Sequence, residues 1–469
     1  MDFVKPSQQK LNNLIKLYQS GQYVDAEKLS LSITKEFPEH PFAWKILAVV
    51  LQQTGRIKES LFACQKSIQL DPQDSSAHNN LGNVLKQFDR LKEAEISYRK
   101  AIQLKPDFFE AKFNLGNLLK QLGKLEEAET IYKKLISLKP DFAEGYYGLG
   151  LLLQQNGRIE EAISAFTKSI DINPHFLLSI NTLVRLLTIY TPKEESSHPI
   201  IKVNKDIKKF YKKENFSGMI SDNKVIQIFC KSTGIIKENS LKLESNFSQI
   251  YRQNTIDLNC KRHKTIFNKF NIIPKFCFEC YKVQVEPKSI LELIKLAIVF
   301  DQIKLANNNT RKCMIELRSQ VSGFYKGLIY CSSLEEAYQI AEYLEVILKE
   351  NIEAELHVAV KRGCSEYAIS FPDYKLINKS GPQKMTYNKD WKLIEKQHDS
   401  SNSKTFKEDV PPSIFGLNLN DILIIQNWID YAKGIGDPSA HLLKQNKIFS
   451  SRIYKIAKTR IKKYPWQNR

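Results

Sequence analysis

The sequence lacks the features that direct a chain into or across a membrane. No stretch approaches the roughly 20 consecutive apolar residues of a membrane helix. The first residues, MDFVKPSQQK, contain neither the apolar segment nor the cleavage site of a secretory signal. Eight cysteines spread over 469 residues form no compact framework, which predicts free thiols in a reducing compartment. We therefore expect a cytoplasmic protein without a transmembrane segment.

Several catalytic signatures are missing as well. After residue 190 there is no phosphate-binding loop, no nucleophile elbow and no paired metal motif. This favours a non-enzymatic protein, and we predict no catalytic residue, no metal ligand and no cofactor.

The positive charge is concentrated in the second part of the chain. The formal net charge is +19; residues 1–190 hold 24 basic and 21 acidic residues, so +16 of it falls in residues 191–469. Such basicity fits nucleic acid, an acidic partner or anionic lipid. It fits equally well the bias toward Lys, Asn and Ile that runs through the whole chain.

A repeat of about 34 residues, long enough for one helical hairpin, runs through the first part of the chain. It places five prolines in register, and a second set of turn residues keeps step with them: Pro38, Pro72, Pro106, Pro140 and Pro174; Gly21, Gly55, Asp89, Gly123 and Gly157. Between these markers, small residues such as Gly82 and Ala94 alternate with large ones at helical spacing. This pattern predicts stacked helical hairpins, because no single hairpin can bury its own apolar face.

These residues resemble the tetratricopeptide repeat (TPR) family over residues 7–190, with five repeats and a capping helix at 175–190. The resemblance implies an all-α solenoid whose first helices line a concave groove. It further implies that this groove binds a protein or peptide, so that the protein acts as a scaffold or adaptor.

In that family the groove is lined by fixed positions of each repeat. Transferred to this sequence together with the asparagines beside them, they give the predicted peptide-binding residues: Lys45, Gln52, Asn79, Asn80, Asn83, Lys86, Gln87, Phe113, Asn114, Asn117, Lys120, Gln121, Tyr147 and Gln154. The asparagines are similar to a ladder in the repeats of protein O-linked N-acetylglucosamine transferases. There, side-chain amides can bond an extended peptide backbone whatever its sequence. Alternatively, these Asn and Gln residues are ordinary polar surface.

The second part of the chain, after residue 190, shows a weaker pattern of strands and helices. Strands are expected at 276–286, 312–317, 324–331, 355–360 and 367–371, and helices at 289–305 and 334–350. This order predicts an α+β domain, with a ferredoxin-like arrangement as the candidate. Lys326, Gly327 and Tyr330 match an RNA-recognition motif only weakly, because Leu328 stands where an aromatic residue is needed.

One cysteine pair invites a functional interpretation. Cys277 and Cys280 form a CxxC, but we expect a strand there, which would point the two thiols to opposite faces. Buried, unreactive thiols are therefore the prediction. His263 lies within the sequence Lys-Arg-His-Lys, which indicates a solvated basic patch.

These observations predict five parts: a TPR superhelix at 7–190, a linker or peripheral helices at 191–249, an α+β domain at 250–378, a flexible linker at 379–412 and a basic helical tail at 413–469. The leading functional hypothesis is an interaction scaffold that binds a peptide or partner protein in the groove. The alternatives are an RNA-binding adaptor acting through the basic second half, and an enzyme, for example glycosyltransferase-like, that reads its substrate with the repeats.

Overall fold

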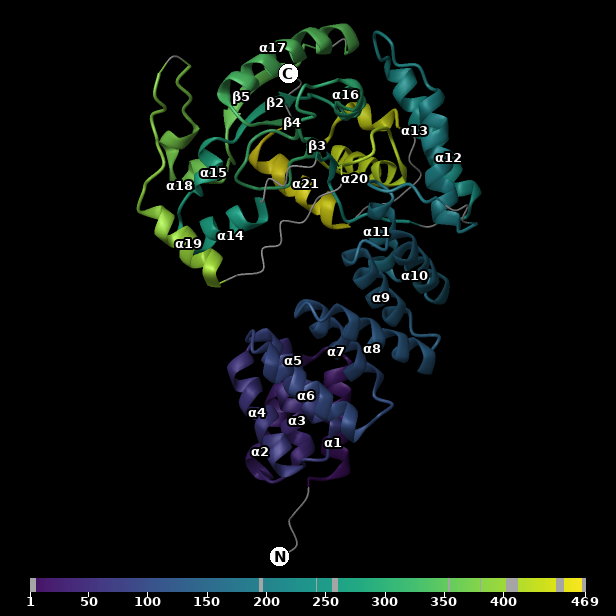
Figure 1. Cartoon of the computed structure of the whole chain (residues 1–469), viewed down its shortest axis with the longest axis vertical. Coiled ribbons are helices and arrows are strands. Elements are labelled where there is room, and N and C mark those ends of the chain that lie inside the picture. The colour runs from purple at the N-terminus through teal and green to yellow at the C-terminus, as the bar shows by residue number, and fades with distance from the viewer. Residues whose placement is uncertain are drawn as a thin grey trace, which may run out of the picture. The chain divides into compact units, whose positions relative to one another are not determined.

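The structure is a computed structural model that describes residues 6–193, 197–241, 243–254, 260–352, 355–379, 381–401, 412–443 and 451–465. The chain divides into two compact units, Met1–Leu183 and Val184–Arg469. Figure 1 shows the first as helices only and the second as a sheet with helices around it.

The first unit is a series of helical hairpins. Its helices are α1 (Gln8–Gln19), α2 (Tyr23–Glu36), α3 (Pro41–Gln53), α4 (Ile57–Leu70), α5 (Ser75–Gln87), α6 (Leu91–Leu104), α7 (Phe109–Gln121), α8 (Leu125–Leu138), α9 (Ala143–Gln155) and α10 (Ile159–Ile172), followed by α11 (Leu177–Leu186). From α3 onward, the first helices of successive hairpins begin at a constant spacing, at Pro41, Ser75, Phe109 and Ala143. The helical solenoid predicted from the period is confirmed.

Each hairpin turns at the same position of the repeat. Gly21, Gly55, Gly123 and Gly157 have positive φ angles between 73° and 82°, and Asp89 occupies the same place with φ 60°. Glycine adopts this left-handed backbone without a steric cost, and Asp tolerates it better than most residues. The second period in the sequence therefore marks the turns.

The two helices of a hairpin approach closely where a glycine faces an aromatic ring. A Cβ atom added to Gly82 would lie 2.6 Å from the Tyr98 ring, and one added to Gly116 would lie 2.9 Å from the Tyr132 ring. Both tyrosine rings are fully buried. The recurring glycine thus makes room for the largest side chain in the hairpin core.

The second unit contains one five-stranded sheet. Its strands are β1 (Gln249–Arg252), β2 (Tyr281–Glu286), β3 (Arg311–Ile315), β4 (Tyr325–Cys331) and β5 (His357–Arg362), in the order β1-β3-β4-β2-β5. Every neighbouring pair is antiparallel, and in the register of the central pair Val283 lies opposite Ile329.

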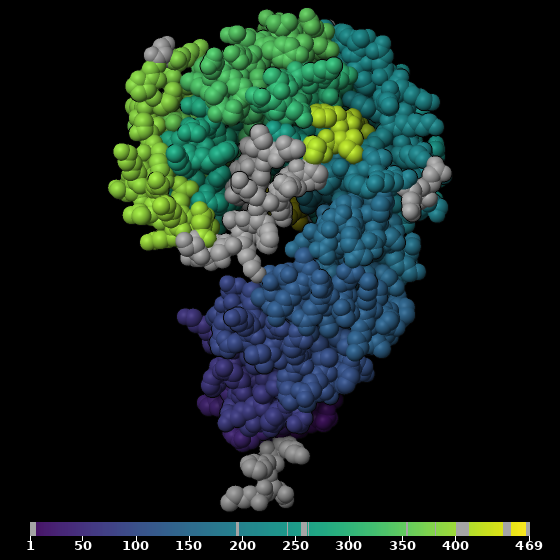
Figure 2. All heavy atoms as spheres, viewed as in Figure 1, coloured from purple at the N-terminus to yellow at the C-terminus, as the bar shows by residue number. Residues whose placement is uncertain are grey.

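Helices surround this sheet. They are α12 (Pro199–Lys213), α13 (Asp222–Glu238), α14 (Cys260–Phe270), α15 (Lys275–Phe278), α16 (Ile290–Gln302), α17 (Leu334–Asn351), α18 (Tyr367–Ser370), α19 (Trp391–Ser401), α20 (Leu419–Ile435) and α21 (Ser451–Lys463), with short 3₁₀ turns η1 (Pro372–Lys375) and η2 (Pro438–His441). In the view of Figure 2, the segment of α18 and α19 forms the left edge of the second unit, and α19 lies beside α14.

The two faces of the sheet differ in chemistry because side chains alternate along a strand. Val283, Val285 and Ile329 are fully buried on the face that α16 and α17 cover. On the same face, a Cβ atom at Gly327 would meet side chains of α16. The opposite face carries Lys282, Lys312 and other polar residues.

Three predictions of local structure were wrong. The run at 276–286 begins as a helix, since Pro274 starts the turn α15 and the strand begins only at Tyr281. The run at 367–371 is the helical turn α18, with the Phe371 N–H donating to the Tyr367 carbonyl at 2.8 Å. The polar segment at 379–412 contains the helix α19, whose Trp391 packs against a cluster that includes Phe278; residues 402–411 lie outside the described ranges.

A buried ion cluster joins three distant segments of the second unit. Arg252 of β1 donates through Nε to Asp301 of α16 at 2.8 Å and through Nη2 to Asp421 of α20 at 2.6 Å. All three side chains are at most 4% exposed. Both carboxylates bond the guanidinium in bidentate geometry, so the three charged groups satisfy one another.

The glycine–tyrosine contact gives a first testable prediction. Replacing Gly82 by Ala should lower the free energy of unfolding by about 1–3 kcal/mol, because the methyl group would force the Tyr98 ring from its place. The loss should appear in a urea titration followed by far-UV circular dichroism, even though Ala is the better helix former. Gln87→Ala, at an exposed position of the same helix, is the control and should change the value by no more than about 0.5 kcal/mol. Equal stability of Gly82→Ala and the unmodified protein would contradict this packing.

Candidate functional site

The predicted peptide-binding residues all lie on the first helices of four consecutive hairpins. They occur at equivalent positions: Lys45 and Gln52 on α3; Asn79, Asn80, Asn83, Lys86 and Gln87 on α5; Phe113, Asn114, Asn117, Lys120 and Gln121 on α7; Tyr147 and Gln154 on α9. Gln87 and Gln121 are exposed; the rest are half-buried, except for Asn79, which is buried.

The structure pairs two of these asparagines with each other. Asn114 of α7 donates through Nδ2 to Oδ1 of Asn79 on α5 at 3.0 Å. Asn79 is only 7% exposed. Its bond therefore joins two hairpins, and Asn79 is poorly placed to contact a peptide.

Two other asparagines are fixed by tyrosines. The Tyr98 hydroxyl donates to Oδ1 of Asn83 at 2.7 Å, and one repeat later the Tyr132 hydroxyl donates to Oδ1 of Asn117 at 2.8 Å. Each bond uses only the carbonyl oxygen of the amide. The NH₂ groups of Asn83 and Asn117 remain donors with a fixed orientation.

Two lysines lie near these asparagines. Burial lowers the pKa of Lys86, and burial together with the charge of Lys86 lowers the pKa of Lys120. Among the described residues, no carboxylate lies within ion-pair distance of either ammonium. Lys45, by contrast, pairs with Asp74 at 2.7 Å.

Aromatic residues support the same row of helices. The ring centroids of Phe113 and Phe142 lie 5.8 Å apart, and those of Tyr147 and Phe176 lie 5.4 Å apart, both edge to face. Such pairs fix the ring orientation beyond what burial alone achieves.

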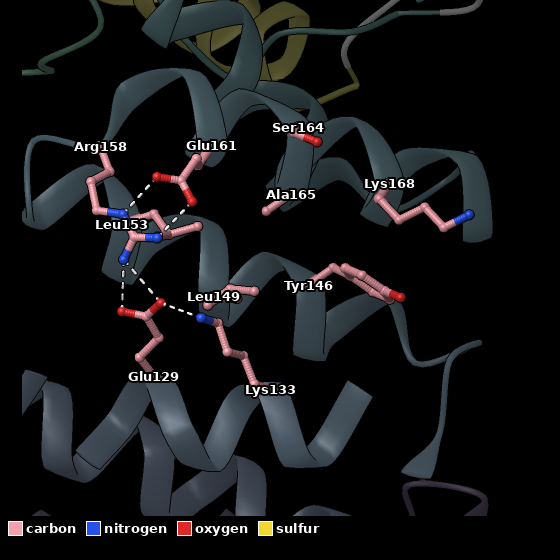
Figure 3. Close-up of a pocket in the computed structure, with 10 residues that line it drawn as sticks. All are labelled: Glu129, Lys133, Tyr146, Leu149, Leu153, Arg158, Glu161, Ser164, Ala165 and Lys168. Atoms are coloured by element: carbon pink, nitrogen blue, oxygen red, sulfur yellow. Dashed lines mark hydrogen bonds and ion pairs between the residues drawn. The ribbon is translucent and has the colours of Figure 1, made fainter. Parts of the chain in front are cut away.

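A pocket of the first unit lies among α8, α9 and α10 and has a volume of about 320 Å³ (Figure 3). Its charged residues satisfy one another: Glu129 accepts from Lys133 and Arg158, and Arg158 also donates to Glu161. Figure 3 shows this network along one wall, with Tyr146 and Lys168 apart from it. The pocket therefore presents few unsatisfied groups to a ligand.

The second unit contains a larger cavity, of about 950 Å³, on the polar face of the sheet. Lys282, Lys312 and Tyr330 form part of its floor. The walls include α14, α15, the loop at 316–322 and the segment around α18. Lys282 and Lys312 lie with their Nζ atoms 5.0 and 5.7 Å from the centre of the Tyr330 ring. Burial lowers the pKa of Lys312 to about 8.

Thiols also line this cavity. Cys277 lies in the turn α15 and Cys280 directly before β2, so both reach one cavity and the predicted strand geometry of the CxxC was wrong. Burial raises the pKa of Cys280 to about 11.

His263 is 5% exposed and stacks on Phe276 with ring centroids 5.2 Å apart, so the predicted solvated basic patch was wrong. Within the described ranges, no three His, Cys, Asp or Glu side chains are arranged to hold a metal ion.

A carboxylate at the edge of the cavity forms ion pairs with two basic side chains. Glu316, fully buried, accepts from Arg318 at 2.7 Å and from Lys326 at 2.8 Å. Burial opposes its ionisation, but hydrogen bonds and charge from Arg318 and Lys326 outweigh burial and lower the pKa of Glu316 to about 2.

Comparison with family models matches the first unit. A TPR repeat model matches residues 116–157, and tetratricopeptide repeat models match residues 43–74, 63–96 and 143–176. Residues 43–176 are a tetratricopeptide repeat region. No curated protein matches the chain.

Among solved structures, the chain is similar to YrrB, described as a TPR protein with an unusual peptide-binding site, at 21% identity over 38% of this chain and 91% of that one, with a TM-score of 0.32. It is similar to TTC0263, a TPR protein of Thermus thermophilus, at 22% identity over 38% and 98%, with a TM-score of 0.35. It is similar to MamA of Desulfovibrio magneticus RS-1 at 18% identity over 36% and 96%, with a TM-score of 0.33. None of the helices described has the length and hydropathy needed to span a bilayer.

The Glu316 cluster gives a prediction with a defined pH range. Because the pKa of Glu316 falls from an ordinary 4.5 to about 2 on folding, its ion pairs stabilise the fold above about pH 4.5, and that contribution is lost as the pH falls toward 2. Glu316→Gln should therefore lower the free energy of unfolding by on the order of 3 kcal/mol at pH 6 and by progressively less toward pH 3. Urea titrations across this range measure the difference.

The matched control is Glu342→Gln, at an exposed position of α17. Its free energy of unfolding should equal that of the unmodified protein at every pH. A Glu316→Gln deficit that does not change with pH would show that the cluster stabilises by packing and not by charge.

Proposed function

We propose that residues 7–190 form an interaction scaffold that binds an extended, acidic segment of a partner protein along the first helices of the repeats. The observation that carries this proposal is the repeated pair of a tyrosine-fixed asparagine and a desolvated lysine, Asn83 with Lys86 and Asn117 with Lys120. The two pairs occupy equivalent positions of consecutive repeats, on α5 and α7.

The asparagines account for binding to the backbone of a peptide. Their oxygens are occupied by Tyr98 and Tyr132, so the NH₂ groups are left to donate to peptide carbonyls. Because the tyrosines fix the amides before binding, less side-chain entropy is lost when a peptide docks. Contacts of this kind read the backbone and tolerate many sequences.

The lysines account for a preference among those sequences. Each ammonium is partly desolvated, so an incoming carboxylate forms a charge-assisted bond in a medium of lower dielectric constant than water. Two such sites next to each other favour a peptide with two acidic side chains. We therefore propose an acidic peptide and retain the prediction that the protein acts in the cytoplasm.

We also propose that residues 250–378 are a ferredoxin-like domain. The support is the order of the strands: β2 lies between β4 and β5, β3 lies beside β4, and the helices α16 and α17 follow β2 and β4. β1 adds a fifth strand at the edge beside β3. The domain boundaries predicted at residues 249, 378 and 412 remain predictions.

Selection of random peptides on the full chain tests the scaffold proposal. Selected peptides should be enriched in Asp and Glu, because Lys86 and Lys120 supply two positive charges that no carboxylate of the described residues pairs. The double variant Lys86→Met/Lys120→Met should lose this enrichment and bind a fluorescent acidic peptide about 10- to 100-fold more weakly in an anisotropy titration.

Lys92→Met is the matched control, since Lys92 is an exposed lysine on the second helix α6. It should bind the acidic peptide like the unmodified protein. Selection without acidic enrichment, or unchanged affinity of the folded double variant, would refute the proposal.

A further inference from the structure

The cavity of the second unit has the size and lining of a small-molecule site. Its volume of about 950 Å³ falls in the range of pockets that enclose metabolite-sized ligands. Met314 and Leu328 provide apolar surface beside the lysines of the floor. Such a mixture suits an organic ligand with one charged group.

The charges around the cavity are unbalanced. Three carboxylates line it, and each is already engaged: Glu316 by Lys326 and Arg318, Glu366 by Arg318, and Glu286 by Lys361. Lys282 and Lys312 lie between the walls without a carboxylate within ion-pair distance among the described residues. The cavity therefore carries a surplus of positive charge.

The surroundings of Lys282 show where part of this surplus positive charge lies. The lysine is 7% exposed, and the hydrogen-bond partner of its Nζ is the Sγ atom of Cys364 at 3.5 Å. Sulfur of a thiol is a weak acceptor, so within the described part of the chain this buried ammonium has no strong hydrogen-bond acceptor. Burying a cation without a counter-charge is unfavourable, and a bound anion would remove that cost.

Tyr330 lies between the two lysines. Both ammonium groups lie over its ring, at 5.0 and 5.7 Å from the centroid, an attractive cation–π geometry that partly replaces water. Both positive charges thus adjoin the same ring, and the charge of Lys282 acts on Lys312. A doubly charged phosphate satisfies two ammoniums at once, whereas a single carboxylate leaves one charge uncompensated.

We propose that this cavity binds a small phosphorylated organic molecule, whose phosphate lies between Lys282 and Lys312 above Tyr330 and whose organic part lies against Met314 and Leu328. The site is independent of the peptide-binding helices proposed for the first unit, since every residue lining it belongs to the second.

Isothermal titration of the full chain with phenyl phosphate tests the proposal, with benzoate at equal ionic strength as the singly charged comparison. Phenyl phosphate should bind and benzoate should bind at least about tenfold more weakly. Lys282→Met and Lys312→Met should each weaken phenyl phosphate binding about 10- to 100-fold. Lys349→Met, at an exposed position of α17, should leave it unchanged.

Proton uptake provides a readout that needs no variant. Free Lys312, with a pKa of about 8, is half protonated at pH 8, and a bound dianion raises that pKa. Binding at pH 8 should therefore be accompanied by net proton uptake, measured from the dependence of the heat on the ionisation enthalpy of the buffer. The other charged and titratable groups facing Lys312 are Lys282, Arg318, Tyr330, Cys260 and Cys364, together with Tyr251 opposite it on β1.

Two results would overturn the proposal. One is benzoate binding as tightly as phenyl phosphate, which would mean that the paired charges are not used. The other is phenyl phosphate binding without proton uptake at pH 8, together with normal binding by folded Lys312→Met. If both lysine variants fail to fold, the comparison of phenyl phosphate with benzoate on the unmodified protein decides.

Discussion

The second unit depends on the burial of Arg252 between two aspartates. This one side chain ties the edge strand β1 to α16 through Asp301 and to α20 through Asp421, segments separated by 49 and 169 positions in the chain. Asp421 also accepts from the backbone N–H of Asn418 and so caps the helix that it anchors. A buried charge of this kind permits little variation in geometry, because any shift would leave a charge uncompensated. The cluster thereby fixes α16 and α20 against the edge strand, while the cavity lies on the polar face of the sheet.

The sequence was sufficient to predict the first unit, because its physics is local and repeated. A glycine facing Tyr98, a turn residue at Asp89 and a constant period recur in register, and each repetition strengthens the same inference. The side-chain contacts within the predicted groove were harder to predict from the sequence. Asn79 and Asn83 differ in role because one faces Asn114 and the other Tyr98, and both partners lie in other helices.

The cavity could not be predicted from local patterns, although a signal was present. Three strands each carry a lysine as their second residue, in YKVQVE, RKCMI and YKGLIYC, among residues that are otherwise largely apolar. One such lysine is ordinary, since strand faces alternate. Only the register, which sets Lys282 opposite Tyr330 and Lys312 opposite Leu328, brings the charges to one face of adjacent strands. The thiol pair was misjudged for a local reason: Pro274 begins a helical turn within an apolar run that was predicted as a strand.

Both units contain a pair of neighbouring, partly buried lysines, despite their different folds. In each, two lysines lie close together, partly desolvated and without a carboxylate partner among the described residues: Lys86 with Lys120, and Lys282 with Lys312. Such pairs are unfavourable for folding, because like charges repel and burial removes their water. Some other buried cations are neutralised within the chain, as Lys326 is by Glu316 and Lys45 by Asp74. Others donate to backbone carbonyls, as Lys112 does to Pro106. An anionic ligand bound at either lysine pair would offset the cost of burying it and would stabilise the fold.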